Sequence, residues 1–222
     1  MTDPVRLELD GQLATLHMTA GENRHNLDWL AAINAALDEV EAAEAVLVTT
    51  GEGKFFSNGL DLDWLMSGAD TSGFFEALHA LFARLLTFPT ATAAAVNGHA
   101  FGAGLQLALA HDHRVMRADR GYACMPEIDI GAPLTAGMSA IMRATVPAET
   151  LREMMTTGRR YTGPEAVAGR FVHATADENQ VLATAIAAVE PLIGRDPATM
   201  HRIKVDLFRD QLPALDPERW PS

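Results

Sequence analysis

The sequence predicts a mixed α/β fold that ends in a helical region. In the first half of the chain, short apolar runs alternate with segments of helical periodicity. In the second half, helical segments dominate and only short apolar runs separate them. The chain has 222 residues, of which 48% are hydrophobic and 21% are charged, and this composition suits one globular domain with a substantial core.

The chain is predicted to open with a β-hairpin. Apolar residues alternate over 5–9 and again over 14–18, and Asp10 and Gly11 supply a two-residue turn between them. Residues 27–45 then predict an amphipathic helix, because apolar side chains recur there at helical spacing. The other elements predicted in this half are a strand over 46–50, a helix over 74–88 that Pro89 stops, and a strand over 90–96.

The second half is predicted to be mostly helical. A glycine-rich turn opens into a helix after residue 102, and short strands follow over 114–118 and 122–125. The later helices are predicted over 134–145, 147–157 and 163–169, then over 177–192 with Asp177 as its cap, and over 197–212 with Pro197 in its first turn. Residues 216–222 contain two prolines and are not expected to continue this last helix.

Composition excludes several classes of function. The net charge is -12 and no stripe of Lys or Arg occurs, so nucleic acid is not an expected partner. No apolar stretch is long enough to span a bilayer, and the N-terminus lacks the pattern of a signal peptide. A single cysteine, Cys124, and a C-terminus unlike the peroxisomal Ser-Lys-Leu signal lead us to expect a cytoplasmic protein.

Residues 97–131 carry the strongest chemical signal. The apolar run 93–96 reaches a glycine-rich turn that opens directly into a helix, and the unpaired N-H groups of a helix start bind anions. About twenty residues later, Glu127 follows a proline in mostly apolar company, where loss of solvent raises the pKa of a carboxyl group. A second loop-to-helix junction lies at 51–65. Together these features predict a site for enolate chemistry.

Three motifs in order resemble the crotonase superfamily, the enoyl-CoA hydratase/isomerase group. They are Lys-Phe-Phe-Ser-Asn-Gly-Leu-Asp-Leu at 54–62, Ala-Val-Asn-Gly-His-Ala-Phe-Gly-Ala-Gly at 95–104, and Met-Pro-Glu-Ile-Asp-Ile-Gly at 125–131. The resemblance extends to about residue 212, and the stretch 111–131 is most similar to the plant peroxisomal 3-enoyl-CoA to 2-enoyl-CoA isomerases. It implies a spiral of ββα units, with residues 1–195 as the crotonase-type core and 196–222 as a short helical extension of the same structural unit.

The resemblance also implies how the site works. Two backbone N-H groups, here those of Leu60 and Ala103, are expected to form an oxyanion hole for the thioester oxygen of an acyl-CoA. Glu127 is the expected catalytic residue. Homotrimers or hexamers are implied, CoA enters as part of the substrate, and neither a metal nor a separate cofactor is expected.

Position 106 favours an isomerase over a hydratase. Hydratases of the family carry a second glutamate three residues after the oxyanion donor, whereas this chain has Gln106. An amide does not take a proton at neutral pH, so two-carboxylate water addition lacks one partner, while moving a proton between two carbons needs one carboxylate. A hydratase in which Gln106 holds the water, and a non-catalytic acyl-CoA-binding member of the fold, remain the alternatives.

Further residues are candidates for contact with the substrate. Gln106, Asn58, Phe101 and Trp64 are expected in the pocket, and part of the methionine-rich stretch 138–155 is expected either there or in the core. Lys204, Lys54 and Arg24 are candidates for the CoA phosphates, and Lys204 is favoured because the family has a lysine on its last helix. Residues 111–113, His-Asp-His, are interpreted as a helix end or as polar residues of the core rather than a metal site. Asp129 is interpreted as structural or solvated, because it would point away from the Glu127 side if the segment is extended.

Overall fold

Two β-sheets organise the computed structural model, which describes residues 3–216. The main sheet has the strand order β1-β2-β3-β5-β7-β9. Its strands are β1 (Val5–Asp10), β2 (Leu13–Met18), β3 (Val46–Gly51), β5 (Thr92–Val96), β7 (His113–Arg117) and β9 (Ala174–Ala176). The pair β1 and β2 is the antiparallel hairpin predicted from the sequence, and every later neighbour in this sheet pairs in parallel.

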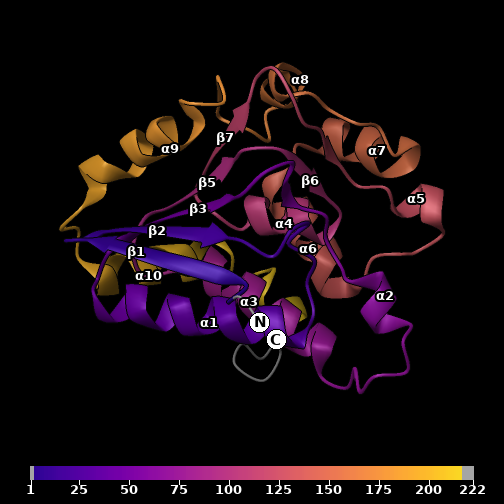
Figure 1. The fold of residues 1–222 in the computed structure, drawn as a ribbon, viewed down its shortest axis with the longest axis horizontal. Coiled ribbons are helices and arrows are strands. Elements are labelled where there is room, and N and C mark those ends of the chain that lie inside the picture. Colours follow the sequence, from indigo (N-terminus) through magenta and orange to yellow (C-terminus); the bar gives the residue numbers. More distant parts are fainter. Residues whose placement is uncertain (1–2, 217–222) are drawn as a thin grey trace.

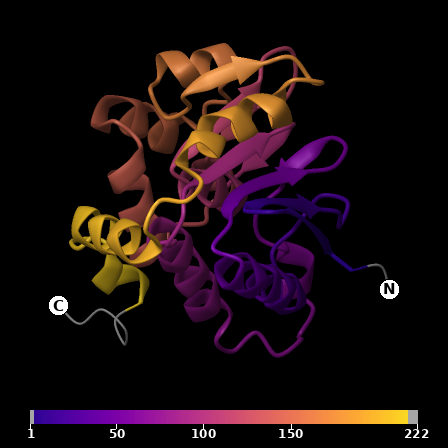
Figure 2. The ribbon, with the colours of Figure 1, turned by 90° about the vertical axis from the view of Figure 1, so that its left-hand side faces the viewer.

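Helices cover both faces of the main sheet because its strands are apolar on both sides. In β3, Val46 and Val48 belong to one hydrophobic cluster and Leu47 belongs to another, as the alternation of side chains along a strand requires. Helix α9 (Val181–Val189) covers the face with the two valines, and α1 (Leu27–Ala42) covers the opposite face. Figures 1 and 2 show the sheet between these two helices.

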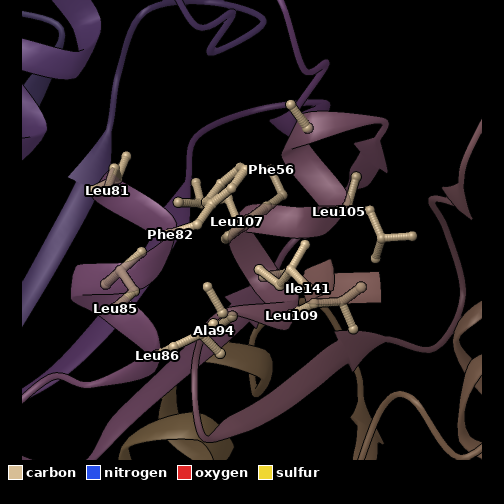
Figure 3. Close-up of a cluster of buried hydrophobic side chains, with 14 of the residues drawn as sticks. Phe56, Leu81, Phe82, Leu85, Leu86, Ala94, Leu105, Leu107, Leu109 and Ile141 are labelled. Atoms are coloured by element: carbon tan, nitrogen blue, oxygen red, sulfur yellow. The ribbon is translucent and has the colours of Figure 1, made fainter. Parts of the chain in front are cut away.

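The larger core lies on the α1 side of the sheet. There α3 (Phe74–Leu86) packs with α4 (Ala103–Leu109) and α6 (Ala136–Thr145). Figure 3 shows side chains of α3, including Phe82, directed toward Leu107 of α4 and Ile141 of α6. This packing fixes the position of α4, whose first residue belongs to the candidate site.

A second, smaller sheet consists of β4 (Phe55–Ser57), β6 (His99–Phe101) and β8 (Ala123–Cys124). All neighbours in it are parallel, so the three strands end at the same edge. The sequence predicted only β8 as a strand, because segments of three residues flanked by glycine and asparagine carry no readable alternation. This sheet brings together chain segments that are far apart in sequence.

The remaining elements surround these sheets. They are α2 (Leu62–Leu65), α5 (Glu127–Ile130), α7 (Ala148–Thr157), α8 (Gly163–Ala168), the 3-10 helix η1 (Glu190–Leu192), α10 (Pro197–Leu207) and α11 (Leu212–Leu215). The segment containing Glu127 and Asp129 is thus helical, so the condition of an extended segment, under which Asp129 would point away from Glu127, is not met.

Two predicted helix boundaries were also wrong. Asp177 does not cap a helix, since α9 begins at Val181 and the backbone carbonyl of Asp177 accepts the N-H of Val181 in the preceding turn. The helix predicted over 197–212 ends at Leu207, and the chain turns before α11. That turn directs Leu212 and Leu215 into the main core, against α3 and α6. Residues 217–222, for which no helix was predicted, lie outside the described residues.

The segment His111-Asp112-His113 lies where α4 passes into β7. His111 is buried, and its two ring nitrogens bond to the carbonyl oxygen of Leu107 at 2.8 Å and the hydroxyl of Thr49 at 2.9 Å. Within residues 3–216, no three His, Cys, Asp or Glu side chains gather as a metal site would require. The same residues include no helix with the length and apolar character needed to cross a membrane.

The packing of α3 against α4 predicts a large cost for a cavity at Phe82. The side chain of Phe82 is fully buried, so Phe82→Ala should lower the free energy of unfolding in urea by about 3–5 kcal/mol. Leu9→Ala is the control, because Leu9 is 45% exposed and its loss should change stability by about 0.5 kcal/mol or less. Equal effects of the two substitutions would contradict this description of the core.

Candidate active site

A cleft of about 530 Å³ lies beside the ends of β4, β6 and β8. Its size falls in the range of small-molecule sites, which is about 300–1,000 Å³. Four parts of the chain line the cleft. They are Asn58, Gly59, Leu60, Leu62, Asp63, Leu65 and Met66 after β4; Phe101, Gly102 and Ala103 at the start of α4; Pro126, Glu127, Ile130, Ala132, Pro133, Leu134, Thr135 and Met138 on and between α5 and α6; and Arg24 and Phe75. Figure 1 shows α2, α5 and α6 on this same side of the molecule.

Leu60 presents a backbone N-H to the cleft. It lies in the turn after β4, where its two neighbours pair with the backbone of His25, through the carbonyl of Gly59 and the N-H of Asp61. The N-H of Leu60 itself has no backbone acceptor in the described part of the chain. Gly59 has a φ of 81°, and a Cβ there would lie 2.7 Å from the carbonyl oxygen of Phe101, so only glycine fits this turn.

Ala103 presents the second N-H. It is the first residue of α4, where a backbone N-H has no partner within the helix. A Cβ on Gly59 would lie 3.2 Å from the amide nitrogen of Ala103, which places the two turns in direct contact. The structure therefore brings the N-H groups of Leu60 and Ala103 to one cleft from positions 43 residues apart in the sequence.

Glu127 is the first residue of α5 and follows β8. A Cβ on Gly102 would lie 3.2 Å from its Oε1, so the carboxyl group reaches the residue next to Ala103. Its Oε2 is buried and has no hydrogen-bond partner within residues 3–216. Burial raises the pKa of Glu127 from 4.5 to about 7, so the group exchanges its proton near neutral pH.

Three of the other residues predicted for the site line this cleft: Asn58, Phe101 and Arg24. The Asn58 amide donates to Glu22 at 2.9 Å, which holds the start of the turn that carries Leu60. Arg24 is paired with both Glu22 and Asp63, at 2.7 and 2.6 Å, and so presents a neutralised group at the edge of the cleft.

Gln106 and Trp64 do not lie where the sequence led us to expect them. Gln106 is fully buried behind the cleft wall, where its Nε2 donates to the carbonyl oxygen of Met138 at 3.1 Å. Trp64 packs against Phe74 in an edge-to-face arrangement, with ring centroids 5.2 Å apart, rather than facing the cleft. Both positions correct the expectation that these side chains line the pocket.

Two candidate cations also lie away from the cleft. Lys204 is 4% exposed, and its ammonium donates to Asp112 at 2.6 Å and to the carbonyl oxygen of Thr90 at 2.8 Å. It is a structural ion pair that ties α10 to the main sheet, which corrects its expected place at the CoA phosphates. Lys54 is exposed, lies over the ring of Phe55 and does not line the cleft.

Sequence reasoning missed several lining residues. Thr135 caps α6, and its hydroxyl lies 2.7 Å from Nε2 of His79. Phe75 and Met66 supply exposed apolar surface at the cleft. Thr135 carried the signal of a helix N-cap, but nothing local showed that it faces the site. Of the methionine-rich stretch, Met138 lines the cleft, whereas Met142 and Met154 are buried in the core.

The fold and the cleft together have known counterparts. A family model described as enoyl-CoA hydratase/isomerase matches residues 13–216. The chain is 38% identical to the peroxisomal enoyl-CoA delta isomerase 2 of Arabidopsis thaliana over 186 residues, 78% of each protein. It is 33% identical to the peroxisomal enoyl-CoA delta isomerase 1 of the same plant over 216 residues, 93% of this chain and 90% of the relative.

A solved structure agrees with these relatives. A probable enoyl-CoA hydratase from Mycobacterium tuberculosis superposes with a TM-score of 0.90 at 27% identity, covering 96% of this chain and 92% of the other. The chain therefore belongs to the enoyl-CoA hydratase/isomerase family, and it is an enzyme of the crotonase superfamily with the crotonase-type α/β fold.

The buried carboxyl of Glu127 predicts a specific dependence of stability on pH. Its pKa is about 7 in the folded protein against 4.5 as the ordinary value, so the folded state holds the proton more tightly than the unfolded state. This group therefore lowers the free energy of unfolding as pH rises from about 4.5 to 7. Glu127→Gln should melt at a higher temperature than the wild type at pH 8 and lose that advantage below about pH 4.5. A melting difference that does not change with pH would contradict the assignment.

The ion pair of Lys204 predicts a loss of stability when it is broken. Lys204→Met leaves Asp112 partly buried without its cation, so the free energy of unfolding should fall by about 2–4 kcal/mol in urea. Lys54→Met removes an exposed cation and should change stability by about 0.5 kcal/mol or less. An unchanged stability in Lys204→Met would show that the pair is not formed.

Proposed function

We propose that the protein is an acyl-CoA isomerase that shifts the double bond of a 3-enoyl-CoA to the 2-position. The observation that carries this proposal is a cleft where two unpaired N-H groups, of Leu60 and Ala103, lie with the one buried carboxyl group of Glu127. The names of the plant relatives, enoyl-CoA delta isomerases, support the same reaction.

In the proposed mechanism, the thioester oxygen accepts hydrogen bonds from the N-H groups of Leu60 and Ala103. Glu127 in its ionised form removes a proton from C2, and the electrons move into a dienolate whose oxygen carries the negative charge. The two N-H groups stabilise that charge more strongly than they bind the neutral thioester. Protonated Glu127 then returns the proton to C4, which leaves the double bond between C2 and C3.

A pKa of about 7 allows Glu127 both to remove the proton from C2 and to return it to C4. A group that titrates near 7 is partly ionised at neutral pH, and it is also acidic enough to give the proton back. The transfer uses a single proton and a single carboxyl group, so the proposed step needs neither a metal nor a redox cofactor. The trimeric or hexameric assembly and the cytoplasmic location implied by the sequence are part of the same proposal.

The surroundings of Gln106 argue against water addition. A hydratase needs a second group in the cleft to activate water, and Gln106, at the position of that second glutamate, is fully buried and bonded to the backbone of Met138. The other carboxylate lining the cleft is Asp63, which is exposed and paired with Arg24. Neither side chain is arranged to take a proton from water beside the thioester.

Replacing Glu127 tests the proposal directly. Glu127→Gln should lower turnover of 3-enoyl-CoA by about 10²–10⁴-fold, because the amide cannot carry the proton, while acyl-CoA binding measured by calorimetry changes little. Products are identified by chromatography and mass. Asp129→Asn is the matched control, since this carboxylate lies on the same short helix but does not line the cleft.

Three outcomes would contradict the proposal. Normal turnover in Glu127→Gln would remove the proposed base. Formation of 3-hydroxyacyl-CoA from 2-enoyl-CoA, at a rate comparable to isomerisation, would indicate a hydratase. Binding of acyl-CoA by the wild type without conversion of any 3-enoyl-CoA would indicate a non-catalytic member of the fold.

A further inference from the structure

The turn that carries Leu60 depends on a histidine that lies far from it in the sequence. The backbone of His25 pairs with the turn on both sides of Leu60, accepting from Asp61 at 3.0 Å and donating to Gly59 at 2.8 Å. Between β4 and α2, the carbonyl groups of Leu60 and Asp61 accept from Leu62 and Leu65 of α2, but Gly59 and the N-H of Leu60 make no hydrogen bond to the backbone of β4 or α2. The position of the Leu60 N-H is therefore set by what holds this turn from outside.

The side chain of His25 adds a contact through Ser57. The Ser57 hydroxyl donates to the carbonyl oxygen of Asn23 at 2.7 Å, and it accepts the N-H of Gly59 at 3.1 Å. Nε2 of His25 lies 2.9 Å from the same oxygen. A hydroxyl has a single proton, which the Asn23 carbonyl takes, so His25 must donate to Ser57 from Nε2-H. The orientation of the hydroxyl toward Gly59 thus depends on His25.

His25 is a fixed donor rather than a proton carrier. Its ring is fully buried and stacked on Trp29, with centroids 4.0 Å apart and planes at 16°. Burial lowers the pKa of His25 to about 3, so the ring stays neutral at any pH where Glu127 titrates.

The packing of position 25 against Trp29 does not by itself require a histidine. With the proton on Nε2, Nδ1 is an acceptor, and this buried atom has no partner within residues 3–216. A buried acceptor without a partner costs about 1–3 kcal/mol, and phenylalanine would stack on Trp29 without that cost. What a phenylalanine lacks is the donor to Ser57.

We propose that His25 is a positioning residue of the oxyanion hole: its backbone N-H holds the Gly59 carbonyl, whose planar peptide unit carries the N-H of Leu60, and its side chain, through Ser57, anchors the preceding N-H of Gly59. This inference rests on the proposed function, since it assigns a role to the same pair of N-H groups. His25 does not line the cleft and does not touch the substrate. It acts on the reaction only through the geometry of the turn.

A small displacement of the Leu60 N-H should weaken its hydrogen bond to the dienolate more than its hydrogen bond to the substrate thioester. A hydrogen bond to the charged dienolate oxygen is stronger and more sensitive to geometry than one to the neutral thioester oxygen. Loss of the His25 donor should therefore lower kcat and leave KM nearly unchanged. It should also weaken the polarisation of a bound thioester carbonyl, which infrared spectroscopy measures directly.

The experiment compares His25→Phe and His25→Gln in the full chain. His25→Phe keeps the stacking on Trp29 and removes the donor, and it should lower kcat by about 10–100-fold. It should also reduce the downshift of the carbonyl stretch of a bound, carbonyl-labelled saturated acyl-CoA. His25→Gln carries an amide N-H that reaches Ser57 and should restore most of both quantities. The pH dependence of kcat/KM, which reports Glu127, should be the same in both variants.

His111→Phe is the matched control. His111 is also a buried histidine bonded to a threonine hydroxyl and a backbone carbonyl, but it lies away from the cleft. It should lose stability without any change in the carbonyl stretch. If His25→Phe does not fold, Ser57→Ala gives the test, because it removes the same link from the other side and should reduce the downshift in the same way.

The results separate the two proposals. Wild-type kcat and carbonyl stretch in a folded His25→Phe or Ser57→Ala protein would overturn the role of His25, and so would an equal loss of carbonyl polarisation in His111→Phe. If the wild type polarises the carbonyl but converts no 3-enoyl-CoA, the proposed function fails, and the comparison of carbonyl stretches still decides the role of His25.

Discussion

The close approach of two turns is the constraint on which the site depends. Gly59 packs against the carbonyl of Phe101 and the amide of Ala103 so tightly that no side chain fits between them. The approach follows from the small parallel sheet, because β4 and β6 end at the same edge and the next residues of each strand must turn there. The two N-H groups lack backbone partners for different reasons: that of Ala103 belongs to the first turn of α4, and the parallel bridge between Leu60 and His25 uses the carbonyl of Gly59 and the N-H of Asp61 rather than the N-H of Leu60.

Burial has two effects on this site that reinforce each other. The apolar surroundings that raise the pKa of Glu127 also lower the local dielectric around the N-H groups, and a hydrogen bond to a developing negative charge is stronger there than in water. This burial destabilises the folded state, because the Oε2 of Glu127 is left without a hydrogen-bond partner in the described part of the chain. Other buried atoms share this lack of a partner, among them Nδ1 of His25 and Oε1 of Gln106, whereas the buried groups of Lys204 and His111 are hydrogen-bonded.

Much of the fold could be predicted from the sequence because the apolar residues of its longer helices and strands recur at regular spacing. The hairpin, α1, α3 and the main-sheet strands β3, β5 and β7 follow from alternation, apolar runs and helical spacing over five or more residues, whereas the three-residue strand β9 was not predicted. The strands β4 and β6 could not be predicted, because three residues are too few to show a period and their pairing partners lie 23 to 44 residues away. The helix α9 was placed too early because Asp177 resembles a cap, but its backbone closes a turn instead.

For the candidate site, sequence reasoning reached the groups that belong to motifs. Leu60, Ala103 and Glu127 lie at one cleft, as the glycine-rich turns and the proline-glutamate pair indicated. Sequence reasoning failed for side chains whose direction depends on distant partners. Gln106 turns toward Met138, and Lys204 turns toward Asp112, 92 residues earlier in the chain. No local pattern encodes such a choice, because burial is decided by the packing of whole elements.

The small sheet also brings the three groups of the candidate site to one cleft from distant parts of the sequence. Each strand of β4, β6 and β8 is followed by one functional group, namely the Leu60 N-H, the Ala103 N-H and the Glu127 carboxyl. The three groups arise from three separate chain crossings, yet the turns that carry them touch, since a Cβ on Gly59 would lie 3.2 Å from the amide nitrogen of Ala103 and one on Gly102 would lie 3.2 Å from Oε1 of Glu127. The three turns are therefore interdependent, and a side chain added at Gly59 would displace the amide of Ala103 as well as that of Leu60.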